Sequence, residues 1–105
     1  MNNEFNKKII VRVDKDLAEI IPVFLENRQK DCKSIKEALE KGDYETIRIL
    51  GHSMKGVGGG YGFDAVTDLG ASIEQAAKNK DAAEINNLID ELMTYLDRVE
   101  VVFVD

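Results

Sequence analysis

Apolar residues recur about every 3.6 positions along three stretches of the chain, and this spacing predicts amphipathic helices. The three stretches begin near Asp43, Asp64 and Asp81. A fourth stretch, over residues 17–39, has the same period, but Pro22 interrupts it. Because proline donates no backbone hydrogen bond and crowds the preceding turn, we expect one of two arrangements. The helix is kinked at Pro22, or a short helix ends near Ile21 and a longer one starts with Pro22 at its first position.

Local signals mark where the predicted helices begin and end. Gly42 can end the first long helix, and Asp43 can then cap the second. Asp81 and Glu84 have the spacing of a capping box at the start of the last helix. Because the connections are only a few residues long, neighbouring helices must turn back on one another.

The two ends of the chain are rich in β-branched residues. Residues 9–13 are too few for a sheet of their own, so we expect an extended segment that lies over the helices. At the other end, the composition of V-E-V-V-F-V favours a strand, whereas the apolar stripe before it favours a continued helix. We expect its Val101, Val102 and Phe103 to pack in the core; the alternatives are that they cover the end of the bundle or contact a partner.

These elements predict an all-α fold, an antiparallel up-down-up-down four-helix bundle over residues 14–105. A short extended or helical N-terminal segment over residues 1–13 precedes the bundle. Nothing in the pattern supports a sheet core.

Composition limits the class of protein. The 105 residues suffice for one domain with a single core, and 44 % apolar with 32 % charged residues is typical of a soluble globular protein. No apolar run approaches the roughly 20 residues that cross a bilayer, and the N-terminus is too polar for a signal peptide. The net charge of −6 argues against nucleic acid and anionic membranes as partners. We expect a cytoplasmic monomer.

The chain has one cysteine, Cys32, and one histidine, His52. A single cysteine excludes an internal disulfide. One cysteine and one histidine are also too few for a zinc cluster or another metal site. A catalytic Cys/His pair is possible in principle. However, Cys32 falls near the apolar stripe of its own helix, so we expect a buried side chain without chemistry.

His52 lies on the polar side of its predicted helix. At about 100° per residue, five apolar side chains fall together on one side and form a stripe for the core. These are Ile47, Leu50, Met54, Val57 and Tyr61. On the opposite side, the neighbours of His52 are Arg48, Ile49, Lys55, Gly56 and Gly59. We therefore expect the imidazole to stand in solvent.

Five glycines occur between positions 56 and 62. Each glycine in a helix interior costs about 0.8–1.0 kcal/mol relative to alanine. Two interpretations stay open. Either the helix ends near Lys55 and the glycines form a loop, or the bare positions let another folded surface approach the exposed imidazole.

An exposed imidazole is neutral over most of the physiological pH range and is a competent nucleophile toward an activated phosphoryl group. Lys55, one turn after His52, can supply a cation to the phosphate oxygens, and Arg48, one turn before, is a second candidate. The chain lacks a P-loop, a kinase glycine-rich loop and an acidic cluster for Mg²⁺ near His52. It can accept and donate a phosphoryl group but cannot energise one, so we expect no kinase or other enzyme activity.

The segment H-S-M-K-G-V-G-G-G-Y-G-F, followed by L-G-A-S-I-E-Q-A-A, resembles the signature of histidine-containing phosphotransfer (HPt) domains. The matching positions are His52, Lys55, Gly56, Gly62, Leu69 and Glu74. Met54 and Ile73 stand where the family usually has leucine, which are exchanges of similar volume. For Glu74, the choice between supporting the bundle and supporting the docking face stays open, and we favour the bundle.

The resemblance implies a partner, the receiver domain of a response regulator. Its aspartyl phosphate supplies the phosphoryl group and its Mg²⁺ assists the transfer, so the HPt protein needs no cofactor of its own. The phosphoryl group passes from aspartate to histidine and on to another receiver. A hybrid histidine kinase is a further possible partner.

Docking of a receiver needs an apolar centre with a polar rim. Ile49 is a candidate for the apolar centre, because it lies outside the stripe that packs in the core. Gly56 and Gly59 keep the approach to His52 open, and Arg48 lies beside them. Two other functions stay open: a helical adaptor that binds and inhibits a receiver without phosphotransfer, and the phosphoacceptor domain of a larger hybrid kinase. We expect an independent chain rather than a domain of a larger kinase.

Overall fold

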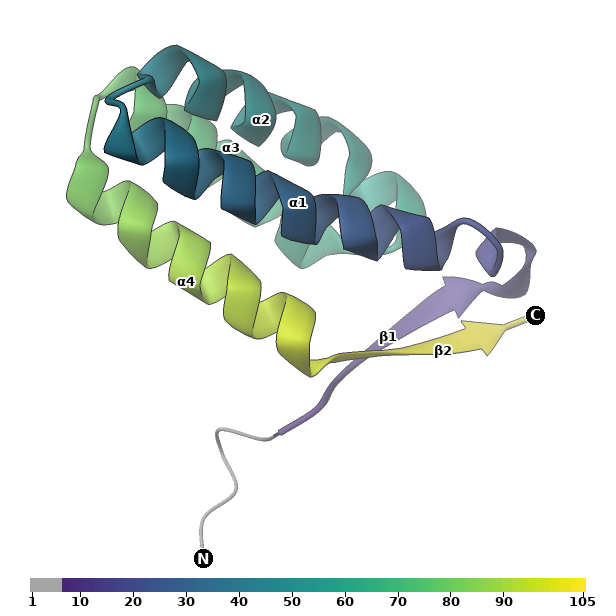
Figure 1. Cartoon of the computed structure of the whole chain (residues 1–105). Helices are drawn as coiled ribbons and strands as arrows, with labels where there is room; N and C mark the ends of the chain where they lie inside the picture. Colours follow the sequence, from purple (N-terminus) through teal and green to yellow (C-terminus); the bar gives the residue numbers. More distant parts are fainter. Residues whose placement is uncertain (1–6) are drawn as a thin grey trace, which may run out of the picture.

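Four helices form the body of the protein in a computed structural model, which describes residues 7–105. They are α1 (Ile21–Glu40), α2 (Tyr44–Val57), α3 (Asp64–Lys78) and α4 (Ala82–Arg98). Each helix packs against the next one in the chain, and α4 packs against α1, which closes the bundle (Figure 1). The predicted all-α four-helix bundle is confirmed. The first six residues of the predicted N-terminal segment lie outside the described residues, and its boundary at residue 13 stays a prediction.

The predicted apolar stripes meet in one core. Its fully buried side chains include Ile35, Ile47, Met54, Ile73, Ile85 and Leu92. Aromatic rings fill the end of the core at which α1 begins. The ring of Phe24 lies 4.9 Å from that of Tyr61 and 5.1 Å from that of Phe63, measured between centroids. Through these contacts, the segment after α2 packs against the first turn of α1.

The helix ends follow the sequence signals. Gly42 adopts a φ of 68° after α1, a conformation that glycine reaches at no steric cost. Asp43 then accepts a hydrogen bond from the amide of Thr46, and Asp81 accepts one from the amide of Glu84. At the first helix, the structure has two helices, as in the second alternative, but the short one ends at Leu17 and not near Ile21. Pro22 lies in the first turn of α1, and a separate 3₁₀ helix, η2 (Lys15–Leu17), precedes it.

Helices α2 and α3 cross at two glycines. A Cβ atom built on Gly51 would lie 2.7 Å from the amide nitrogen of Glu74, and one built on Gly70 would lie 2.6 Å from that of Lys55. Real Cβ atoms do not approach other atoms so closely, so the two backbones meet here without side chains between them. The close approach of the two backbones brings together the side chains of α2 and α3 that lie next to Gly51 and Gly70.

The two ends of the chain form a parallel sheet. Strand β1 (Ile9–Asp14) pairs with β2 (Val99–Val104) in a register that runs from Ile9 opposite Val99 to Asp14 opposite Val104. The predicted extended conformation of residues 9–13 is confirmed, but their pairing with the other end of the chain was not predicted. Each segment alone is too short for a sheet, but the bundle brings the two ends of the chain side by side, where their backbones complete each other's hydrogen bonds.

The expected core position of the C-terminal residues is wrong in part. Val101 is half-buried, but Val102 and Phe103 are exposed. Because side chains alternate between the two faces of a strand, Val102 lies on the face turned away from the helices. The sheet contributes the buried Val13 to the core, and Val11, Val99 and Val101 pack against the core while partly buried.

Candidate functional site

His52 stands on the surface of α2. Its side chain is 68 % exposed, whereas Ile47 and Met54 of the same helix are fully buried. The amphipathic pattern of α2 therefore turns the imidazole away from the core, as the sequence predicts. The exposure leaves the ring open to a second protein.

The carboxylate of Glu74 holds one edge of this ring. Nδ1 of His52 lies 3.1 Å from Oε2 of Glu74, which comes from α3 and is 10 % exposed. Two lysines also face this carboxylate, with Nζ of Lys55 3.7 Å and Nζ of Lys78 3.8 Å from its oxygens. The sequence favoured a supporting role in the bundle for Glu74, but the structure makes it a direct partner of the histidine.

The charges around Glu74 fix its protonation state. Burial acts to raise the pKa of this carboxyl group, but the hydrogen bond with His52 and the positive charges of His52, Lys55 and Lys78 outweigh it. The pKa is thus lower than its ordinary value, and Glu74 is ionised at neutral pH. An ionised carboxylate only accepts hydrogen bonds, so Nδ1 of His52 carries the hydrogen. In the neutral ring, the lone pair then lies on Nε2.

The two candidate cations, Lys55 and Arg48, have different carboxylate partners. Lys55 is half-exposed and lies one helical turn after His52, where Glu74 holds it beside the ring. Arg48 lies one turn before His52, and its guanidinium is ion-paired with Glu45. Both cations have a carboxylate partner. The contact of Lys55 with Glu74 is long, at 3.7 Å, so Lys55 can turn toward an incoming phosphoryl group more easily than Arg48 can leave Glu45.

In the glycine-rich segment, some positions have open space around them and others contact α3. A Cβ atom built on Gly56 would meet no atom within 4 Å, so this position is open. Helix α2 ends at Val57, and a 3₁₀ helix, η3 (Gly59–Tyr61), follows. The amide of Gly59 donates a hydrogen bond of 2.7 Å to the hydroxyl of Thr67 on α3. The prediction that Gly59 extends the helical face of His52 is wrong, because the helix stops before it.

Residues 19–101 match the family model of the Hpt domain. The chain belongs to the Hpt domain family. Hpt domains are phosphotransfer carriers of two-component signalling, and they interact with receiver domains. Comparison with curated proteins and with solved structures found no match. Within residues 7–105, none of the helices combines the length and the apolar character that crossing a bilayer requires.

The structure of this Hpt domain adds residues that the sequence did not single out. Gly51 and Gly70 bring α2 and α3 together, and this contact places Glu74 beside His52. A signal was present, because both glycines interrupt otherwise apolar helix faces, where a glycine often marks a close approach of two backbones. The sequence instead drew attention to the five glycines after Lys55, of which Gly56 and Gly60 have open space around them.

Ile49 is an exposed apolar side chain on α2, as expected from its place outside the core stripe. It lies three positions before His52, which is nearly one helical turn. Its role in docking stays a prediction for this Hpt domain.

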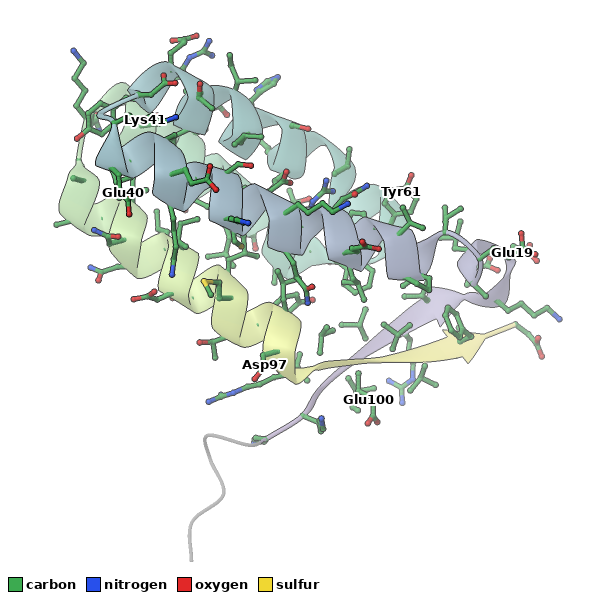
Figure 2. All side chains as sticks on the ribbon, in the orientation of Figure 1. Glu19, Glu40, Lys41, Tyr61, Asp97 and Glu100 are labelled. Carbon is green, nitrogen blue, oxygen red and sulfur yellow. The ribbon has the colours of Figure 1, made fainter. Side chains whose placement is uncertain are left out.

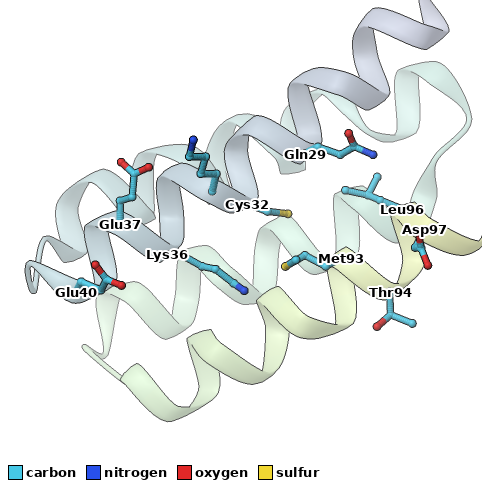
Figure 3. A pocket seen from close by; sticks show the side chains of 10 residues that line it. Gln29, Cys32, Lys36, Glu37, Glu40, Met93, Thr94, Leu96 and Asp97 are labelled. Carbon is cyan, nitrogen blue, oxygen red and sulfur yellow. The ribbon is translucent and has the colours of Figure 1, made fainter.

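Cys32 takes no part in the site around His52. It is buried and points into a groove of about 730 Å³ between α1 and α4 (Figure 3). Burial, together with the charge of Asp31, raises the pKa of its thiol to about 11. The thiol is therefore protonated at neutral pH and is a poor nucleophile. The predicted buried side chain is confirmed, and His52 has Glu74, not Cys32, as its partner.

Proposed function

We propose that this Hpt domain carries a phosphoryl group on Nε2 of His52. It accepts the group from the aspartyl phosphate of one receiver domain and passes it to the aspartate of another. The observation that supports this most directly is the hydrogen bond between Nδ1 of His52 and the ionised Glu74, on a ring that is otherwise exposed.

The arrangement suits a nucleophilic displacement at phosphorus. The lone pair of Nε2 attacks the phosphorus atom, the N–P bond forms, and the P–O bond to the receiver aspartate breaks with its electron pair on the carboxylate. No proton has to move, because Nδ1 already carries its hydrogen. The ring becomes cationic as the bond forms, and the carboxylate of Glu74, 3.1 Å away, stabilises that charge.

Lys55 supplies a positive charge that stabilises the transferring group. Its ammonium lies beside the ring and is half-exposed, so it can turn toward phosphate oxygens at Nε2. A positioned cation is one of the parts that phosphoryl transfer regularly uses. Glu74 keeps this lysine near His52 before the partner arrives.

The receiver docks on the exposed surface of α2. Ile49 supplies an apolar contact, and Gly56 leaves space for the approach along the helix. Arg48 lies beside them and can exchange Glu45 for a carboxylate of the partner. The protein brings no activated phosphate of its own, so the receiver and its Mg²⁺ supply the energy and the electrophilic assistance. The carrier then has no kinase activity.

The proposal is tested by mixing the protein with a phosphorylated receiver domain and Mg²⁺. We expect a label on the Hpt domain that is labile in acid and stable in base, and we expect His52→Gln to eliminate it. A label that persists in this variant would place the acceptor elsewhere. Binding of the receiver without any label would instead support an inhibitory adaptor.

A further inference from the structure

Strand β2 has an open edge. Within residues 7–105, its backbone hydrogen-bonds to β1 on one side and to no other element on the other side. The outer side of β1 is approached by the chain after η3, since a Cβ atom built on Gly62 would lie 3.5 Å from the carbonyl oxygen of Arg12. Strand β2 therefore carries a row of backbone donors and acceptors that have no partner among the described residues.

The open edge lacks the features that usually protect one. Natural edge strands carry charges, proline or bulges that prevent pairing with another chain. Over its six residues, V-E-V-V-F-V, β2 has one charged side chain, Glu100, and no proline. Val102, Phe103 and Val104 are all exposed. Such a strand is a template for another strand.

The sheet is also incomplete by the standards of its type. Two strands seldom form a stable sheet alone, and parallel sheets are normally covered on both faces. Here the helices cover β1 better than β2. Val13 and Phe103 are cross-strand partners in register, yet Val13 is 2 % exposed and Phe103 is 42 % exposed. A further strand beyond β2 would shield this phenylalanine.

We propose that two copies of this chain pair along β2 about a two-fold axis, which joins their sheets into one of four strands, β1-β2-β2-β1. The two β2 strands run antiparallel, the one orientation that a two-fold axis perpendicular to the sheet gives to a strand and its copy. With the axis at Val102, Val102 meets its own copy, Val101 meets Phe103, and Glu100 meets Val104.

Charge supports a second copy as the occupant of the edge. Glu100, which carries the only charge within β2, lies away from the middle of the strand. With the two-fold axis at Val102, Glu100 therefore never faces its own copy. Like charges directly opposite one another would destabilise the pair, and this arrangement avoids them. Figure 2 shows Glu100 on the face of the sheet away from the helices. On that face, Glu100 lies diagonal to Arg12 of its own β1. The strand is thus complementary to itself.

The proposed dimer leaves the histidines accessible. Figure 1 shows β2 running to the right from the end of α4 along the lower side of the molecule, and α2 along its upper side. Each copy would present His52 away from the shared sheet. The inference is independent of the proposed phosphotransfer, and it departs from the monomer expected from the sequence, which did not predict the sheet.

Sedimentation equilibrium tests the proposal with the full chain. We expect the mass to rise from 11.7 kDa toward twice that value between about 1 μM and about 1 mM, a range that covers weak and moderate dissociation constants. Salt at about 0.15 M limits the repulsion between two copies that each carry a net charge of −6. A monomer at every concentration would overturn the proposal.

Two lysine substitutions separate edge pairing from stacking of the exposed faces. Val102→Lys should raise the dissociation constant about tenfold or more, because two lysines would meet at the axis. Ile10→Lys, on the same face of β1 and comparably exposed, should leave the dimer intact. Equal loss in both variants would mean stacking and would contradict edge pairing. Far-ultraviolet circular dichroism checks the fold. If Val102→Lys unfolds, Val104→Lys is the second test: it places each lysine opposite Glu100 of the other copy, so the dissociation constant should fall, and a rise would contradict the proposed register.

Hydrogen exchange gives a second readout. In the wild-type chain, backbone amides of Val99–Val104 should exchange more slowly at high than at low protein concentration, while amides of α2 should not respond. Protection of β2 that is independent of concentration would overturn the proposal, even if the chain associates.

Discussion

The carboxylate of Glu74 lies 3.1 Å from Nδ1 of His52, although the two residues are 22 positions apart and belong to different helices. Their contact depends on the crossing of α2 and α3 at Gly51 and Gly70. The crossing glycines and the reactive histidine are therefore parts of one arrangement. The carboxylate selects which ring nitrogen carries the hydrogen and leaves the other for chemistry.

Replacing Glu74 by glutamine should slow phosphotransfer about 10- to 100-fold, by analogy with the loss of a carboxylate that orients a metal-ligating histidine. The glutamine amide can donate as well as accept, so it no longer holds the hydrogen on Nδ1. Transfer rates and the ¹⁵N chemical shifts of the His52 ring should change together. Glu91→Gln, an exposed glutamate on α4, is the matched control and should alter neither. A normal rate in Glu74→Gln with an altered tautomer would contradict the role given to the carboxylate.

The glycines of this protein should separate into two classes by alanine substitution. Gly51→Ala and Gly70→Ala should each lower the free energy of unfolding by about 1–3 kcal/mol, because the new methyl group overlaps the facing backbone. Gly56→Ala should instead raise it by up to about 1 kcal/mol, since the position is open and helical. Urea denaturation measures all three, and the opposite order would show that the helices do not meet at Gly51 and Gly70.

A large side chain at Gly56 should block the partner without harming the fold. Gly56→Leu keeps a good helix former at an exposed helical position, so circular dichroism should change little. Transfer from a phosphorylated receiver should fall strongly, because the leucine stands beside the imidazole. Asn86→Leu, at an exposed position of α4, controls for added surface hydrophobicity. Undiminished transfer in Gly56→Leu would refute the assignment of this surface to docking.

The ionised state of Glu74 should contribute to stability in a pH-dependent way. Its pKa in the folded protein is lower than the ordinary value of 4.5, so its contribution is fully present above that pH. The contribution is lost as the pH falls below 4.5 through the folded pKa. The difference in unfolding free energy between wild type and Glu74→Gln should therefore shift against the wild type as the pH falls below 4.5. A difference that does not vary with pH would show that the pKa is not lowered.

Much of the fold could be predicted from the sequence because the deciding signals are local. The 3.6-residue period places the buried stripe of α2, and Asp43 and Asp81 mark helix starts within a few residues of their partners. The exposure of His52 follows from the same period. Each of these features depends on residues that are close in the chain.

The remaining features depend on contacts between distant segments. The hydrogen bond to Glu74 requires the crossing of α2 and α3, which helix periodicity does not show. The sheet joins residues at opposite ends of the chain: the β-branched residues at each end favour an extended conformation, but they do not show that the two ends pair. The position of Gly59 outside α2 does not follow from helix periodicity, because the hydrogen bond to Thr67, on the next helix, helps to hold the segment after the end of α2.

The central claim, that Nε2 of His52 carries the phosphoryl group while Glu74 holds Nδ1, is tested most directly by NMR of the phosphorylated protein. Long-range correlation between ³¹P and ¹⁵N nuclei in a histidine-labelled sample shows which ring nitrogen is bonded to phosphorus. The account predicts phosphorus on Nε2, with the hydrogen on Nδ1. Phosphorus on Nδ1, or on no ring nitrogen of His52, would contradict it.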